Sequence, residues 1–171
     1  MRTMFAVTTA AAMMWGGLAG CSAKSADDIA VGDCVRTSGP SDRPEAAKAA
    51  CGTPESNFKV VAVIAGSAGG TERGTEHCPS DIDSYYSMSK SFSDSRTTIC
   101  LDIDWVVGGC MSVDPQGGRD PIRADCLDST LPGRQRATEI LKDVANGDQC
   151  ASGVGYAYRE RNFTVCVEHV A

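Results

Sequence analysis

Cysteine is the residue type with the most chemistry to offer, because nine of them stand in 171 residues. Cys21 follows Leu18-Ala19-Gly20, the pattern of small residues before a cysteine whose thiol receives a diacylglyceryl group in bacterial lipoproteins. Eight cysteines remain, an even number, which in an exported chain predicts four disulfides rather than free thiolates. These eight are Cys34, Cys51, Cys78, Cys100, Cys110, Cys126, Cys150 and Cys166.

Paired carboxylates are the second group that could do chemistry. Asp102 and Asp104 are two residues apart in an apolar run, and alternation places them on one face of a strand. Such a pair could act as acid and base on a glycan or hold Ca²⁺. The spacing of a calcium loop is absent, so we expect solvated charges on an exposed strand face. A carboxylate-dependent cell-wall enzyme remains the first alternative.

Histidine and metal-binding patterns give little support for catalysis. His77 precedes Cys78, but a nucleophilic pair needs a free thiolate. His169 lies two residues from the end of the chain, and no two cysteines are spaced closely enough for a zinc site. We therefore expect no catalytic residue, no metal and no cofactor. A thiol-redox protein ranks last, because the sequence has no C-x-x-C motif.

Large aromatic residues are scarce, at 6% of the chain. Such residues anchor interfaces or fill the core of a small domain, and the sequence leaves both open. The candidate interface residues are Tyr85, Tyr86, Trp105, Tyr156 and Tyr158.

The N-terminal segment has the features of a lipoprotein signal peptide. Arg2 supplies the positive charge, and the apolar run from Met4 to Gly17 spans only about 21 Å as a helix, too short for a hydrocarbon core of about 30 Å. We expect residues 1–20 to be the signal peptide, residues 21–30 a tether, and the lipid on Cys21 to hold the chain on the outer face of the cell membrane. The net charge of −6 argues against a nucleic-acid partner.

The mature chain contains an internal repeat. Val31-Gly32-Asp33-Cys34 corresponds to Val107-Gly108-Gly109-Cys110, and Thr98-Ile99-Cys100-Leu101-Asp102 corresponds to Thr164-Val165-Cys166-Val167-Glu168. The cysteine spacings between these ends are also similar. The sequence thus predicts a tandem duplication, with a first unit at 31–104 and a second at 105–171.

Each unit is expected to be α+β: a small antiparallel sheet, stapled by two disulfides, with one short helix. Ser80 resembles a helix cap and Asp81 and Asp83 suit a first turn, so a helix is expected up to about Met88. Two segments fit either a strand or a helix, namely 46–51 and 136–144. The expected strands are 30–37, 58–64, 97–107 and 163–169.

Disulfide connectivity follows from this arrangement. The preferred pairs are Cys34–Cys51, Cys78–Cys100, Cys110–Cys126 and Cys150–Cys166. The rival pattern joins the outer cysteines of each unit, Cys34 with Cys100 and Cys51 with Cys78.

The motif set resembles the LppU family of actinobacterial lipoproteins. It consists of Val-Gly-Asp-Cys at 31–34, Cys51 before a strand, Cys78-Pro79-Ser80-Asp81 and Thr98-Ile99-Cys100-Leu101-Asp102. Each unit also resembles the septum-formation-type domain, although Gly109 replaces the aspartate in the second unit. The resemblance implies an envelope lipoprotein without known catalytic residues. The expected function is therefore a non-catalytic binding module for an envelope protein or polymer.

Overall fold

The computed structural model describes residues 28–39, 45–67, 76–89, 95–114, 116 and 119–170. The expected signal peptide, the lipid-bearing Cys21 and most of the tether lie outside these residues. In the described residues, no helix is long and apolar enough to cross a membrane.

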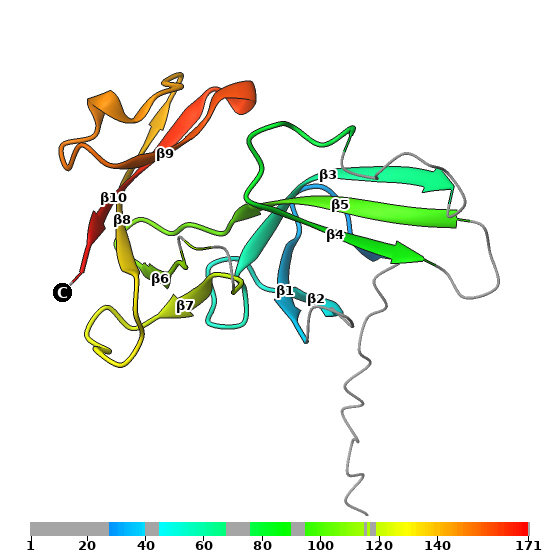
Figure 1. The fold of residues 1–171 in the computed structure, drawn as a ribbon, viewed down its shortest axis with the longest axis horizontal. Coiled ribbons are helices and arrows are strands. Elements are labelled where there is room, and N and C mark those ends of the chain that lie inside the picture. Colours follow the sequence, from blue (N-terminus) through cyan, green and yellow to red (C-terminus); the bar gives the residue numbers. More distant parts are fainter. Residues whose placement is uncertain are drawn as a thin grey trace, which may run out of the picture.

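Each unit is a five-stranded, wholly antiparallel sheet (Figure 1). The first sheet has the strand order β2-β1-β3-β5-β4 and the second the order β7-β6-β8-β10-β9. In the first unit the strands are β1 (Cys34–Ser38), β2 (Glu45–Ala49), β3 (Phe58–Ser67), β4 (Ser84–Ser89) and β5 (Ser95–Ile103). In the second they are β6 (Cys110–Ser112), β7 (Ile122–Ala124), β8 (Arg134–Lys142), β9 (Gly155–Tyr158) and β10 (Phe163–His169).

The α+β prediction is wrong, because the part of the chain that the structure describes contains no α-helix. Helical turns in these residues are confined to short 3₁₀ segments, among them η2 (Gly147–Gln149) and η3 (Arg159–Arg161) of the second unit. Residues 84–89, expected to be helical, form strand β4, and the two ambiguous segments lie in strands β2 and β8. The side chains of Ser80, Asp81 and Asp83 make tertiary contacts instead of capping a helix, so contacts distant in sequence override the local signal.

The duplication is visible in backbone detail. Gly32 N–H donates to Val60 C=O at 2.9 Å, and Gly108 N–H donates to the corresponding Ala137 C=O at 2.7 Å. Both glycines have positive φ, 92° and 85°, which explains why glycine stands at both positions. Just after these hydrogen bonds, each unit has a register shift in its long central pair of strands. In the first unit the shift lies in β3 between Val60 and Ala62, and in the second it lies in β8, opposite Cys166 and Val167 of β10. A bulge at the same place in both units is evidence of a common ancestral unit.

The four preferred disulfides are confirmed. The S–S bonds join Cys34 with Cys51, Cys78 with Cys100, Cys110 with Cys126, and Cys150 with Cys166. The rival pairing of outer cysteines is therefore wrong. Each bond closes a loop within one unit, so the disulfides staple the units but do not join them.

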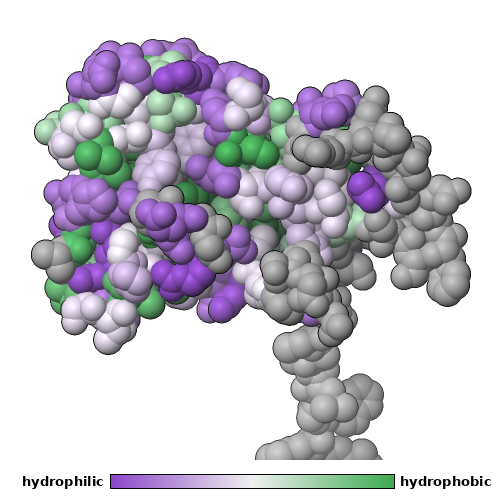
Figure 2. Space-filling model, viewed as in Figure 1, coloured by the Kyte–Doolittle hydropathy of each residue, from purple (hydrophilic) through white to green (hydrophobic). Residues whose placement is uncertain are grey.

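One continuous core runs through both units. It includes Val35, Phe58 and Leu101 from the first sheet and Met111 and Val165 from the second. Strand β5 is buried on both faces from Thr98 to Ile103, because the second unit covers the side that a lone sheet would expose. Outside the core, the face in Figure 2 is mostly hydrophilic, with hydrophobic residues in separate patches. Scattered exposed apolar residues of this kind are ordinary.

Candidate functional site

Arg161 of η3 forms the main charged contact between the units. Its guanidinium holds Asp102 through both carboxylate oxygens, at 2.8 Å and 3.1 Å. A third nitrogen donates to Asp81 at 2.9 Å. The side chains of Arg161 and Asp102 are only 19% and 6% exposed. The expectation that Asp102 is a solvated charge is therefore wrong, because the second unit supplies a buried cation to it.

Tyr158 lies beside this ion pair and adds a second link. Its hydroxyl donates to Asp83 Oδ2 at 2.6 Å, and its ring faces the Arg161 guanidinium at 5.1 Å. Burial raises the pKa of Tyr158 above its usual value, and the negative charge of Asp83 raises it further. The Tyr158 hydroxyl therefore stays protonated and keeps its hydrogen bond to Asp83 of the first unit.

Trp105, in the connection between β5 and β6, packs against Tyr156 of β9 with ring centroids 5.2 Å apart. Its Nε1–H lies close to the Tyr158 hydroxyl without reaching hydrogen-bond geometry. Trp105 and Tyr158 are buried, and Tyr156 is half-buried. These three candidate interface residues thus pack in or against the common core, and only Tyr85 and Tyr86 remain for an external partner.

A second ion pair joins Arg123 of β7 to Asp104. Arg123 Nη2 lies 3.0 Å from Asp104 Oδ2 and also donates to the Asp104 carbonyl oxygen, while Nε donates to Thr53 C=O at 3.0 Å. The same Asp104 oxygen accepts hydrogen bonds from Gly52 N–H and Ser56 Oγ–H, both at 2.6 Å. Asp104 is 6% exposed, so the expected solvated position is wrong for this aspartate too.

Arg123 and Lys48 occupy the same position in the two repeats. Lys48 pairs opposite Val35 in β1, and Arg123 opposite the corresponding Met111 in β6. Lys48 forms its ion pair within its own unit, with Asp33 at 2.6 Å. The counterpart of Asp33 is Gly109, where an added Cβ would lie 3.6 Å from Arg123 Nη1. The glycine removes the local acid, and Arg123 pairs across the junction instead.

Asp102 and Glu168 show the same change of partner. They are equivalent in the repeat, and Glu168 pairs with Arg136 of its own sheet at 3.2 Å, with both side chains more than 40% exposed. Asp102 pairs with Arg161 of the other unit instead. Arg123 and Asp102 thus pair across the junction, whereas their repeat counterparts Lys48 and Glu168 pair within their own units.

The Arg161 guanidinium binds the carboxylates of Asp81 and Asp102, and its charge also acts on the nearby carboxylate of Asp83. Burial raises the pKa of Asp102 to about 7, against the opposing effect of Arg161 and with Asp83 adding to the rise. The pKa of Asp83 is also raised by burial of its carboxyl group, although the residue keeps an exposed surface. The cluster therefore retains a proton at a pH where an isolated aspartate is ionised.

This cluster predicts a pH dependence of stability. Asp102 loses its proton near an ordinary pKa of about 4 when the chain is unfolded, but at about 7 when it is folded. The folded chain therefore binds more protons in this window, and its free energy of unfolding falls as the pH rises from about 4 to about 7. Denaturant unfolding at a series of pH values should show this slope, and D102N should flatten it. Equal slopes in both chains would show that Asp102 does not titrate as described.

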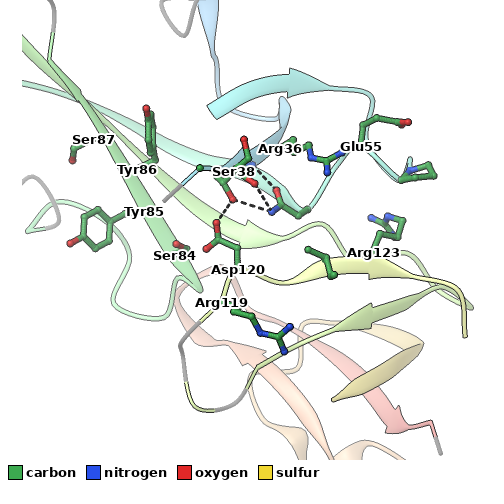
Figure 3. A pocket seen from close by; sticks show the side chains of 15 residues that line it. Arg36, Ser38, Glu55, Ser84, Tyr85, Tyr86, Ser87, Arg119, Asp120 and Arg123 are labelled. Carbon is green, nitrogen blue, oxygen red and sulfur yellow. Dashed lines mark hydrogen bonds between the residues drawn. The ribbon is translucent and has the colours of Figure 1, made fainter. Parts of the chain in front are cut away.

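A groove lies where the first sheet meets the segment before β7. Its volume is about 840 Å³, and Figure 3 shows the labelled residues of β4 on one side with Arg36, Glu55 and Arg123 on the other. Asp120 of the second unit closes one part of the groove, where its carboxylate accepts a hydrogen bond from Thr37 Oγ1 at 2.5 Å. Thr37 is in turn held by Asn57, whose side chain bonds the Thr37 backbone and hydroxyl. Both units thus contribute to the groove.

Two arginines and one tyrosine in the groove face solvent. Arg36 of β1 is exposed and has no ion pair among the described residues, whereas Arg119 is exposed and forms an ion pair with Asp114 at 3.6 Å. Tyr85 is 56% exposed. Guanidinium groups and a tyrosine ring suit recognition of carboxylates and of planar or extended ligands. Arg36 and Tyr85 are therefore available for binding, unlike the junction residues.

The other sequence candidates have structural roles or exposed positions. Cys78 is in a disulfide, so it supplies no thiolate to His77, which is exposed and has an interaction of its own. His169 is also exposed. The Sγ atoms of Cys34 and Cys51 lie within 4.8 Å of an Asp104 oxygen, but sulfurs joined in a disulfide are poor metal ligands.

Sequence reasoning missed the arginines Arg36, Arg119, Arg123 and Arg161. One signal could have pointed to Arg123. Its repeat counterpart Lys48 pairs with Asp33, whereas the position equivalent to Asp33 in the second unit is Gly109. Arg161 has no such signal, because its partners are 59 and 80 residues away.

No protein-family model matches the chain, and comparison with curated proteins and with solved structures gives no significant match. The assignment of a role therefore rests on the geometry of the groove and the junction.

Proposed function

We propose that this chain is a non-catalytic binding module of the cell envelope, exported, anchored through a lipid on Cys21, and related to the LppU-type lipoproteins. Its ligand site is the groove between the first sheet and residues 119–123. The ligand is an envelope protein or polymer, and no cofactor takes part.

The main support for the proposal is that some polar side chains are paired inside the structure, whereas others are exposed in the groove. The junction arginines Arg123 and Arg161 form ion pairs with buried aspartates, and the cysteines of the described region form disulfides. Arg36 and Tyr85 are instead exposed in a groove of about 840 Å³. Polar and aromatic groups that converge on a cleft without a structural role are the usual mark of a binding site.

The alternative of a carboxylate-dependent enzyme gains no support from the geometry. A raised pKa like that of Asp102 suits a general acid, but both of its oxygens are bound to Arg161. Neither Asp102 nor Asp104 lines the groove. A substrate in the groove would therefore not meet them.

The expected anchor fits a ligand near the membrane. The chain from Cys21 to Asp28, where the described structure begins, reaches at most about 25 Å when fully extended. The folded part would then begin close to the outer face of the membrane, within reach of membrane proteins and of the polymer layer next to them.

Site-specific photo-crosslinking in intact cells tests the proposal. A benzophenone amino acid replaces Tyr85 in the groove, and in a matched chain it replaces Leu127, which is 87% exposed in the second unit. We expect one discrete crosslinked product from position 85 that position 127 does not give. No product at position 85, or the same products at both positions, would contradict the proposal.

A further inference from the structure

Strand β4 is the edge of the first sheet: no strand of the described chain pairs with its outer side, and its residues 84–87 line the groove. The Leu101 carbonyl accepts a hydrogen bond from Asp83 N–H at 3.0 Å, and Ile103 N–H donates to the Asp83 side chain. The backbone N–H and C=O groups of Leu101 and Ile103 therefore point toward β4. On β4, the residues that form backbone hydrogen bonds with β5 are then Ser84, Tyr86 and Met88. These residues pair with Leu101, Ile99 and Thr97 in the register.

It follows that the backbone groups of Tyr85 and Ser87 point away from β5. The hydroxyls of Ser87 and its partner Thr98 are 2.8 Å apart, as expected for a non-hydrogen-bonded pair whose side chains lie close. No backbone bond of Tyr85 or Ser87 to another element is present in the described chain. Both residues line the groove.

Among the described residues, this edge lacks the usual protection against pairing. Natural edge strands carry charges, prolines or bulges that block another strand, whereas β4 reads Ser-Tyr-Tyr-Ser-Met-Ser and pairs with β5 without a register shift. The equivalent edge in the second unit is covered: η2 packs on β9, and a Cβ on Gly147 would lie 3.4 Å from Gly155 N. Gly155 is the counterpart of Tyr85, since they pair with Cys166 and Cys100 respectively.

We propose that the groove binds an extended acidic peptide segment, which adds to β4 as a sixth strand and places a carboxylate on Arg36. This inference rests on the proposed function and names the chemistry of its partner. The outward N–H and C=O groups of Tyr85 and Ser87 supply main-chain pairing, the mode by which exposed sheet edges capture peptides. Arg36, exposed and without an ion pair in the described part of the chain, favours an acidic side chain over a basic one.

The test uses the disulfide-bonded chain from residue 22 onward and a peptide selected on it from a random library displayed on phage. Ser87→Pro removes the outward N–H, and Ser87→Ala removes only the hydroxyl. Because proline is tolerated on the open side of an edge strand, both variants should keep the circular-dichroism spectrum of the parent. We expect S87A to bind the peptide like the parent, and S87P to bind at least tenfold more weakly.

The role of the Arg36 charge is tested with Arg36→Glu. The control is Arg159→Glu, at a matched exposed arginine of the second unit. Selected peptides should be enriched in Asp and Glu, and R36E but not R159E should weaken binding at least tenfold. Equal binding by S87P and S87A, or by R36E and R159E, would overturn the inference. A discrete in-cell crosslinked product at position 85 that proves to be a glycan would also overturn the peptide inference. In that case the proposed binding function would still stand. The binding function itself fails only if position 85 gives no specific product.

Discussion

Replacing Arg161 by methionine is expected to lower the free energy of unfolding by about 3 kcal/mol. Methionine keeps most of the volume of the side chain but removes the cation that faces Asp81 and Asp102. Asp102 is 6% exposed at its side chain, so its charge would be left without a partner in a poorly solvated place. The loss should be greatest above pH 7, where Asp102 is ionised.

The matched control is Arg136→Met. Arg136 pairs with Glu168, the repeat counterpart of Asp102, but both side chains are more than 40% exposed. An exposed pair of this kind contributes less than about 1 kcal/mol. Denaturant unfolding of both variants with disulfides intact measures the difference. Equal losses for R161M and R136M would mean that the junction contact adds no stability.

Removing the Cys78–Cys100 disulfide by a double substitution to alanine is expected to cost more than removing Cys150–Cys166. The two bonds are equivalent in the repeat and close loops of 22 and 16 residues. The chain-entropy model gives about 3 kcal/mol for each. The first bond also fixes the turn that carries Ser80, Asp81 and Asp83, all of which contact the second unit.

The excess loss in C78A/C100A over C150A/C166A therefore measures the contribution of that turn to the junction. We expect an excess of about 1–2 kcal/mol, the range of a few lost charge-assisted hydrogen bonds. The measurement is thermal or denaturant unfolding of the two double variants, with free thiols counted to verify the remaining three bonds. Indistinguishable stabilities would show that the turn holds its position without the disulfide.

The features that the sequence predicts well are local or covalent. The strand at 163–169 alternates apolar and polar residues and forms within those bounds. The cysteine spacings, read with the repeat, predict the four pairs, because matching flanks at both ends of each unit restrict which cysteines can meet. Gly32 and Gly108 mark the same backbone turn in both units.

The features that it misses depend on contacts between the units. Ser80 and Asp81 look like the start of a helix, but they bond Glu160 and Arg161, about 80 residues away. Asp102 alternates like an exposed strand residue, yet the second unit buries it. The groove is missed for the same reason, because Thr37 of the first unit and Asp120 of the second meet there only when the two units pack together. Local periodicity carries no information on such pairs.

In the proposed function, the ligand site is built jointly by both units. Photo-crosslinking from position 85, with position 127 as the reference, tests it most directly when it is carried out in the parent chain and in R161M. Arg161 does not line the groove, but it holds the second unit against the first. We expect a specific product in the parent and a marked loss of that product in folded R161M. An undiminished yield in R161M would show that the first unit binds alone, and would contradict the claim.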